Sequence, residues 1–273
     1  MGEILALVAL LSDFGVKDPY VAQMKGVILT MSPSTIIVDI SHEVERHNVQ
    51  EGMLLLASAA QYFPAGTIYV AVVDPGVGGS RRPILIETRR GIYVGPDNGL
   101  LTMAAEMDGI VNVYHLTESK YFAARVSPTF HGRDIFAHVA GHLARGVEPS
   151  NFGKPITDYV RIEFPKAEVR CGEVSGSIIH IDRFGNIVSN IRHQTLESEN
   201  IGYGSIVDFE IDGKNFSAPF CRTYVEASPG GVLATIGSHG FLEVAVCMGD
   251  AAKLLNVNVG ASIRVRRRNP NSY

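Results

Sequence analysis

The first half of the chain alternates between short apolar runs and segments whose apolar residues recur at helical spacing. We expect strands at residues 4–11, 35–40, 67–73, 83–88, 91–94 and 111–115, and helices at residues 20–29, 49–62 and 135–144. Strand–helix alternation of this kind predicts an α/β fold in which a mostly parallel sheet carries helices on both faces.

After about Pro165 the pattern changes. Short β-type runs at 169–181, 187–191, 206–211, 231–236 and 242–246 are separated by Gly, Asn and Ser turns, which is typical of a small antiparallel barrel or sandwich. The proline-containing connector 146–165 is the natural boundary. We therefore expect an α/β N-terminal domain at 1–160 and a smaller all-β, barrel-like C-terminal domain at 166–273.

Composition excludes several classes of protein. The net charge of −4 and the hydrophobic content of 46% are ordinary for a soluble globular chain. The three cysteines are too few and too scattered for a disulfide framework or a zinc site, so a cytoplasmic location fits best. The apolar start lacks a signal-peptide pattern, and no run approaches the ~18 residues that span a membrane. The basic ending, residues 264–268, is interpreted as a solvated strand end and not as a nucleic-acid site.

The segment 71–82, AVVDPGVGGSRR, is the strongest candidate for a functional site. An apolar strand stops at Asp74, and ligands of parallel sheets collect beyond the carboxyl ends of the strands. The glycines allow a tight turn, and Arg81, shortly after them, carries a permanent positive charge. The order of residues fits neither a P-loop nor a dinucleotide fingerprint. The alternative is a hairpin whose Asp caps a turn.

Two further polar clusters stand at element ends in the first half. Asp13, with Asp18, follows the first strand and could take both ribose hydroxyls, or Asp13 could cap the next helix. His131 lies beside Gly132 before a predicted helix, where it could act as an acid–base group or as an orienting group. The alternative is that Asp134 caps this helix and that His131 is incidental.

The second half contributes two more clusters. Phe184 and Asn186 could stack on a purine and bond its edge, or they could form an ordinary turn with Gly185. Residues 237–240, Gly-Ser-His-Gly, resemble a hairpin by themselves. His138 and His142 are four apart but lack the Glu of a zinc motif, and no serine-nucleophile elbow is present. We expect no metal and no cofactor.

Taken together, these motifs resemble one family, the S-adenosyl-L-methionine (SAM) hydrolases or hydroxide adenosyltransferases, which are relatives of the fluorinase and chlorinase. The resemblance covers nearly the whole chain. The matching segments are SDFG with Asp18, VDISHEV (38–44), DPGVGGSRR (74–82), GPDNGLL (95–101), FHGRD (130–134), IDRFGNIVSNI (181–191) and GSHGFLEVA (237–245).

The resemblance implies a fold, an assembly and a site. The fold is an α/β domain followed by a β-barrel domain, assembled as a homotrimer with active sites between subunits. The implied catalytic residues are Asp74, Arg81 and His131. The implied substrate-binding residues are Asp13 for the ribose, Asp18, Asp182 and Ser238 for the methionine, Phe184 and Asn186 for the adenine, and Phe130, Gly132, Glu243 and Val246 from the same motifs.

The residues also separate the branches of this family. Halide-using relatives carry Tyr in place of Asp74, Thr in place of Val77, Ser in place of Gly132 and a Trp near His47. A carboxylate would repel a halide, so the resemblance implies hydrolysis of SAM to adenosine and L-methionine by water attacking ribose C5′. Two departures from the family's pattern are His239 and Gly231. The alternatives are a halogenase of the same family and a non-catalytic adenosine or SAM sensor.

Overall fold

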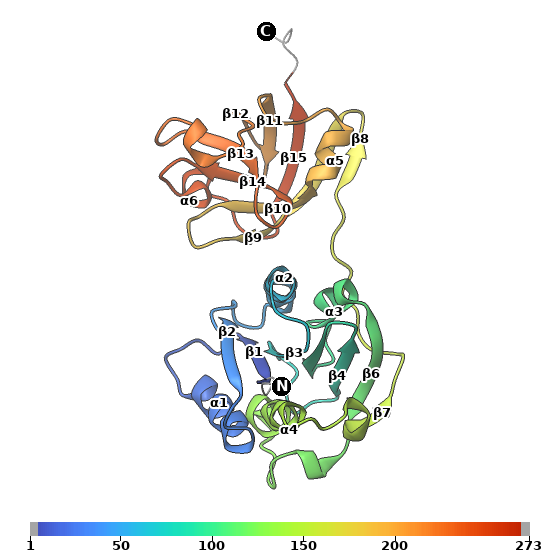
Figure 1. Ribbon diagram of the computed structural model, residues 1–273. Helices are drawn as coiled ribbons and strands as arrows, with labels where there is room; N and C mark the ends of the chain where they lie inside the picture. Colours follow the sequence, from blue (N-terminus) through green and yellow to red (C-terminus); the bar gives the residue numbers. More distant parts are fainter. Residues whose placement is uncertain (1–4, 269–273) are drawn as a thin grey trace. The chain divides into compact units, whose positions relative to one another are not determined.

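The computed structural model describes residues 5–268, and the chain divides into two compact units, residues 1–162 and 163–273 (Figure 1). The N-terminal unit contains β1 (Leu7–Ser12), α1 (Tyr20–Met31), β2 (Ile36–Ser41), α2 (Val49–Ala60), β3 (Thr67–Val72), β4 (Pro83–Thr88), β5 (Gly91–Pro96), α3 (Thr102–Asp108), β6 (Ile110–Leu116), η1 (Ser119–Tyr121), η2 (Gly132–Ala137), α4 (His138–Ala144), η3 (Pro149–Phe152) and β7 (Gly153–Pro155).

The sheet of this unit is mixed, with strand order β2-β1-β3-β5-β4-β6-β7. The neighbours β2–β1, β1–β3 and β3–β5 are parallel, whereas β5–β4, β4–β6 and β6–β7 are antiparallel. The expectation of a mostly parallel sheet is therefore not confirmed. Parallel neighbours need a crossover of about a dozen residues or more, and no helix separates β3 from β4 or β4 from β5.

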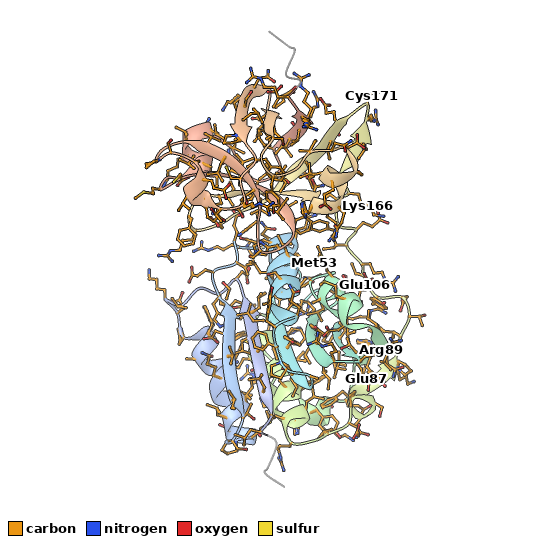
Figure 2. All side chains as sticks on the ribbon, turned by 45° about the horizontal axis from the view of Figure 1, so that its top comes forward. Met53, Glu87, Arg89, Glu106, Lys166 and Cys171 are labelled. Carbon is orange, nitrogen blue, oxygen red and sulfur yellow. The ribbon has the colours of Figure 1, made fainter. Side chains whose placement is uncertain are left out.

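Both faces of the sheet are covered, as the alternation of residues along its central strands requires. In β1, Val8 and Leu10 pack in one core with α1 and α4, whereas Ala9 and Leu11 pack in another with α2 and α3 (Figure 1). Met53 lies on α2 and is buried as well (Figure 2). Strands with two buried faces read as continuous apolar runs, which explains the sequence pattern.

The C-terminal unit is a nearly closed β-barrel. It contains β8 (Glu168–Arg170), β9 (Glu173–Ile181), β10 (Ile187–Arg192), α5 (His193–Ser198), β11 (Ile206–Ile211), β12 (Lys214–Pro219), η4 (Tyr224–Glu226), β13 (Val232–Ile236), β14 (Phe241–Val246), α6 (Ala251–Leu255) and β15 (Ser262–Arg267). Its strands follow the order β12-β11-β15-β9-β10-β14-β13 with antiparallel neighbours. A bridge between Phe220 and Ala234 brings the two ends of this order together.

Most expected elements are present, and the exceptions have local causes. The start of the first strand, Ile4, lies outside the described residues. The expected run 169–181 is broken into β8 and β9 by a turn in which Cys171 has a φ of 51° and is exposed (Figure 2). The basic ending is the outer face of β15, where Arg264 pairs with Glu210 and Arg266 with Asp208. These cross-strand partners account for Arg264 and Arg266 within the fold.

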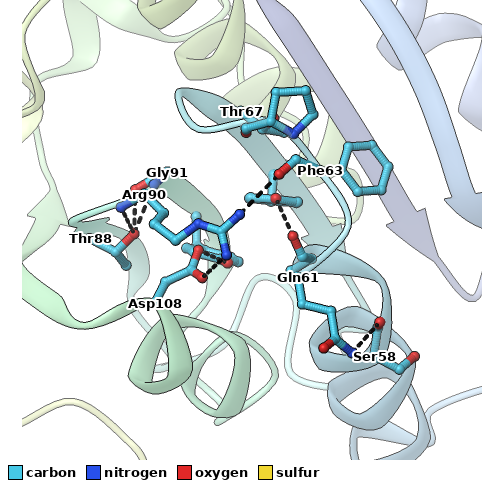
Figure 3. Close-up of polar contacts among 12 residues, drawn as sticks. Ser58, Gln61, Phe63, Thr67, Thr88, Arg90, Gly91 and Asp108 are labelled. Atoms are coloured by element: carbon cyan, nitrogen blue, oxygen red, sulfur yellow. Dashed lines mark hydrogen bonds and ion pairs between the residues drawn. The ribbon is translucent and has the colours of Figure 1, made fainter. Parts of the chain in front are cut away.

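A cluster of polar contacts lies at the edge of the core that packs against α2 and α3. Arg90 donates to the carbonyl of Phe63 and lies 4.0 Å from Asp108 (Figure 3). The hydroxyl of Tyr93 donates to Asp108 at 2.7 Å, and that of Tyr69 donates to the carbonyl of Ala60 at 3.1 Å. Burial, together with the charge of Asp108, raises the pKa of Tyr69 to about 12. Both tyrosines are therefore neutral donors at any physiological pH.

We expect Tyr93→Phe to destabilise the protein more than Tyr69→Phe. The first change takes a donor from a buried carboxylate, at a cost of about 1–3 kcal/mol, whereas the second removes an ordinary hydrogen bond worth about 0.5–1.5 kcal/mol. Urea unfolding of the two variants measures both values. A larger loss for Tyr69→Phe would contradict the role of Asp108.

Candidate active site

A cavity of about 310 Å³ lies at the carboxyl ends of the parallel strands in the N-terminal unit. Its wall is formed by residues that follow β1 and β2, by the end of β3 and the loop after it, and by the segment that leads into η2: Asp13, Phe14, Asp18, Tyr20, Arg46, His47, Val72, Asp74, Val77, Thr129, Phe130, His131 and Gly132. β1 lies between β2 and β3, and the helices that follow β1 and β2 cover opposite faces. This is a topological switch point, where α/β sheets bind ligands.

The loop after β3 brings Asp74 toward the segment that carries His131. The amide of Val77 donates to the carbonyl of Asp74, and Gly78 adopts a φ of 74°. A Cβ on Gly78 would lie 2.3 Å from the carbonyl oxygen of Pro128. Only glycine permits this conformation and this close approach together. The hairpin alternative for this segment is not what forms, because β5 separates β4 from β3.

Asp74, Arg81 and His131 are joined by hydrogen bonds. The Nε of Arg81 donates to both carboxylate oxygens of Asp74 at 3.0 Å, and its Nη2 donates to Oδ2 of Asp74 at 2.5 Å. The same Nη2 lies 2.8 Å from Nδ1 of His131. The side chains of Asp74 and Arg81 are only 5% and 9% exposed. Asp74 and His131 line the cavity, and Arg81 binds both of them from outside its lining.

The tautomer of His131 follows from the contact between its Nδ1 and the guanidinium of Arg81. A guanidinium only donates, so Nδ1 accepts and the ring proton resides on Nε2. Burial and the charge of Arg81 lower the pKa of His131 below its ordinary value, so the ring is neutral at pH 7. His131 directly precedes the π-helical stretch η2, a feature that is frequent at functional sites. Asp134 does not cap this helix; it accepts from the amide of Ser127 and from Arg133 instead.

Asp13 and Asp18 both line the cavity. Asp13 accepts a hydrogen bond of 3.0 Å from the amide of His47, a residue with a φ of 67°. The N-cap position of α1 is Pro19, with no side-chain cap, so the alternative in which Asp13 caps this helix is wrong. The loop that carries Asp13 is held further by Ser12, whose Oγ is 2.7 Å from His42.

A second cavity, of about 680 Å³, lies in the C-terminal unit. Its wall consists of Asp182, Phe184, Asn186, Tyr224, Val246, Met248, Gly249 and Asp250. The turn alternative for this segment is correct as local structure, because Gly185 has a φ of 82° and its amide bonds to the carbonyl of Asp182. The carboxylate of Asp182 also accepts from the side-chain amide of Asn186 at 2.9 Å, which orients that amide.

Ser238 and Glu243 do not line either cavity. Ser238 lies in the hairpin between β13 and β14, closed by a bond from the amide of Gly240 to Gly237. Glu243 is buried and accepts a 2.6 Å hydrogen bond from the hydroxyl of Tyr224, which does line the second cavity. Burial raises the pKa of Glu243. Its contact with the second cavity is therefore indirect.

Some residues at the first cavity could not be found from the sequence patterns. Tyr20, Arg46 and Thr129 belong to its wall, and no sequence pattern marks them; His47 is marked only as the position near a Trp of halide-using relatives. Asn98, in GPDNGLL, donates to the carbonyl of Val73 and so fixes the strand end before Asp74. No local pattern signals this contact, because its two residues are 25 positions apart in the sequence.

Two absences concern residues 5–268. In this part of the chain no three His, Cys, Asp or Glu side chains are grouped as they would be to hold a metal ion. None of the helices described there combines the length and apolar character needed to span a membrane.

Comparison with known proteins gives one consistent result. Residues 8–153 match the SAM hydroxide adenosyltransferase N-terminal domain, and residues 176–264 match the corresponding C-terminal domain. The chain is 37% identical to the (R)-S-adenosyl-L-methionine hydrolase of Methanocaldococcus jannaschii, over 94% of each chain. It is 30% identical to the fluorinase of Actinopolyspora mzabensis, over 96% of this chain and 97% of that one.

The fold is shared with a solved structure as well. The crystal structure of an uncharacterized conserved protein from Thermotoga maritima superposes with a TM-score of 0.91 at 36% identity, covering 95% of this chain and all of the other. Two domain matches and full-length identity above 30% lead to the same assignment. The chain belongs to the SAM hydroxide adenosyltransferase family.

Proposed function

We propose that this protein hydrolyses SAM to adenosine and L-methionine. The observation that carries the proposal is the hydrogen-bonded set of Asp74, Arg81 and His131 at a cavity that also contains Asp13. An anion, a fixed cation and a neutral imidazole are what is needed to hold one water molecule beside a ribose. The family membership and the hydrolase named among the relatives support the same reaction.

In this mechanism the oxygen of a held water attacks ribose C5′ in line with the C5′–S bond. That bond breaks with its electron pair on sulfur, so the sulfonium leaves as the neutral thioether of methionine. No general acid is needed for such a leaving group. Positioning contributes up to ~7–11 kcal/mol, whereas a general base contributes ~10²–10⁴-fold. Placement of the water is therefore the larger effect.

Asp74 accepts the proton of the attacking water. His131 holds its own proton on Nε2 and accepts from Arg81 through Nδ1, so both ring nitrogens are already committed. The imidazole therefore donates to the water oxygen and orients it. Asp74 is the one anion of the three residues and lines the cavity, and Arg81 keeps its carboxylate in place.

The remaining residues bind the rest of SAM. Asp13 takes the ribose hydroxyls and Asp18 the methionine ammonium, with Phe130 and Gly132 beside them. Asn186 and Phe184 take the adenine edge and face, with Val246 in the same cavity. Asp182 and Ser238 bind the methionine part of SAM together with Asp18. Glu243 acts indirectly, through its hydrogen bond with Tyr224. The (R) epimer at sulfur is the proposed substrate because relatives carry that name.

Assembly and location belong to the same proposal. Residues for ribose and water lie in the N-terminal unit, and those for adenine lie in the C-terminal unit. In the proposed homotrimer, one subunit supplies the first set and its neighbour the second. A molar mass of one chain in light scattering would contradict this. The three free cysteines support a reducing, cytoplasmic environment.

The halogenase alternative is disfavoured by the contents of the first cavity. The carboxylate of Asp74 stands at its wall and would repel a halide. The serine of halide-using relatives would also be crowded at Gly132. A Cβ there would lie 3.3 Å from Met24 and Phe130.

The direct test is the reaction of (R)-SAM in heavy-oxygen water. We expect adenosine with the label in its 5′-hydroxyl, L-methionine without label, and the same rate with EDTA. The (S) epimer and added chloride or fluoride serve as comparisons. Absence of adenosine would refute the hydrolase, a 5′-halogenated product would identify a halogenase, and tight binding of unchanged SAM would identify a sensor.

Asp74→Asn and Asp13→Asn make the same chemical change at two points of one cavity. We expect Asp74→Asn to lower kcat by about 10²–10⁴-fold and to keep some activity, because the water is still positioned. Asp13→Asn should instead raise KM, about tenfold, because it weakens a charge-assisted hydrogen bond to substrate. Thermal melts check that each variant is folded, since Asp74→Asn leaves buried Arg81 unpaired. A wild-type kcat for Asp74→Asn excludes its role as the base.

Activity should fall at acid pH with a midpoint below 6.5. Burial and Arg81 lower the pKa of His131, so protonation occurs only below the ordinary histidine value of about 6.5. Protonation of Nδ1 removes the acceptor for Arg81 and ends activity. The unfolded chain binds this proton more readily, so the group also reduces stability as pH falls through that range. His131→Gln should lack this step in the profile of kcat/KM, and a midpoint above 6.5 in the wild type would contradict the assignment.

A further inference from the structure

Three aromatic rings form one wall of the first cavity. Phe14 follows β1, Tyr20 begins α1, and Phe130 precedes His131. Their ring centroids are 6.0 Å apart for Phe14–Tyr20, 5.7 Å for Phe14–Phe130 and 5.3 Å for Tyr20–Phe130, all in edge-to-face contact. The proposed mechanism uses neither Phe14 nor Tyr20, although both line the cavity.

The three rings differ in whether a cationic side chain stacks on their faces. The guanidinium of Arg133 stands 4.9 Å from the centroid of Phe130. No lysine or arginine within residues 5–268 stacks on Phe14 or Tyr20. Tyr20 is 45% exposed, so it keeps accessible ring surface. A cation is attracted to such a face by the quadrupole of the ring.

The charges at the same wall favour a cation over a neutral group. Asp13, Asp18 and Asp74 line the cavity together with Arg46. Arg81 forms an ion pair with Asp74, so the other carboxylates at this wall are Asp13 and Asp18, together with the exposed Arg46. Asp18 and Tyr20 both line the cavity, so a carboxylate and an aromatic ring belong to the same wall.

We propose that Tyr20 and Phe14, beside the Asp18 that takes the methionine ammonium, form a seat for the positively charged sulfur of the substrate and select the sulfonium over the neutral thioether. This proposal rests on the proposed function and adds its specificity. The class of ligand is a nucleoside sulfonium cation. The seat stabilises a charge that the reaction removes, because the leaving group becomes a neutral thioether.

This loss of charge gives the seat a kinetic signature. Interactions that are weaker in the transition state than in the ground state lower KM without raising kcat. Removing the ring of Tyr20 should therefore raise KM and leave kcat unchanged or increased. A ring that only supports the fold of the wall would have the opposite signature, with a lower kcat.

The test compares Tyr20→Leu and Tyr20→Phe with the wild-type protein. For each we would measure kcat and KM for SAM, and the inhibition constant of S-adenosyl-L-homocysteine, which has the same nucleoside and amino acid but no charge on sulfur. Tyr62→Leu is the matched control, because Tyr62 is 76% exposed just after α2 and does not line the cavity.

We expect Tyr20→Leu to raise KM for SAM about 3- to 30-fold, the range of a cation–π contact. The inhibition constant of the homocysteine compound should change less than twofold, and Tyr20→Phe and Tyr62→Leu should resemble wild type. Equal weakening of both ligands, or a lower kcat with unchanged KM, would overturn the seat. If wild-type protein does not hydrolyse SAM, the proposed function fails by itself. In that case calorimetry measures the dissociation constants of SAM and of S-adenosyl-L-homocysteine for the wild-type protein and for Tyr20→Leu. A change in the ratio of these two constants tests the seat in the same way.

Discussion

The buried guanidinium of Arg81 is the interaction on which the first cavity depends. It donates to Asp74 through two nitrogens and to His131 through one of them, so a single side chain fixes two loops that are far apart in sequence. A guanidinium that is 9% exposed needs a carboxylate partner to be tolerated, because an unpaired buried charge is very costly. Each charge of the pair therefore depends on the other, and burial together with the nearness of Arg81 lowers the pKa of His131 and keeps its ring neutral.

The topology decides where this set of residues is built. β1 is flanked by β2 and β3 in parallel, so three strand ends deliver Asp13, His47 and Asp74 to one edge of the sheet. The helices after β1 and β2 lie on opposite faces, which leaves this edge open between them. Gly78 then allows the third loop to approach Pro128, and His131 arrives at the start of a π-helical turn. Backbone geometry thus sets the positions, and the ion pair fixes them.

The sequence predicted what depends on local patterns. Continuous apolar runs indicated strands buried on both faces, and motifs at the ends of strands and at a helix start indicated Asp13, Asp74 and His131, which lie at one cavity. It misjudged strand direction, because the antiparallel course of β4 depends on β5 inserting beside β3. The contacts of Asn98 with Val73 and of Ser12 with His42 join residues 25 and 30 positions apart. Hydrogen bonds over such separations leave no local pattern, and the same holds for the contact of Glu243 with Tyr224.

The charges of the first cavity suit the reaction at each stage. The carboxylate of Asp74 lies at the wall of the cavity, whereas its partner Arg81 lies outside the lining, so a water is accepted there and a halide is repelled. In the proposed reaction Asp13, Asp18 and the ring of Tyr20 favour the cationic reactant. Once sulfur loses its charge, its attraction to the ring ends, and the neutral thioether and adenosine are held less firmly than SAM was. The same electrostatic arrangement therefore draws in the substrate, excludes the competing nucleophile and weakens the hold on the products.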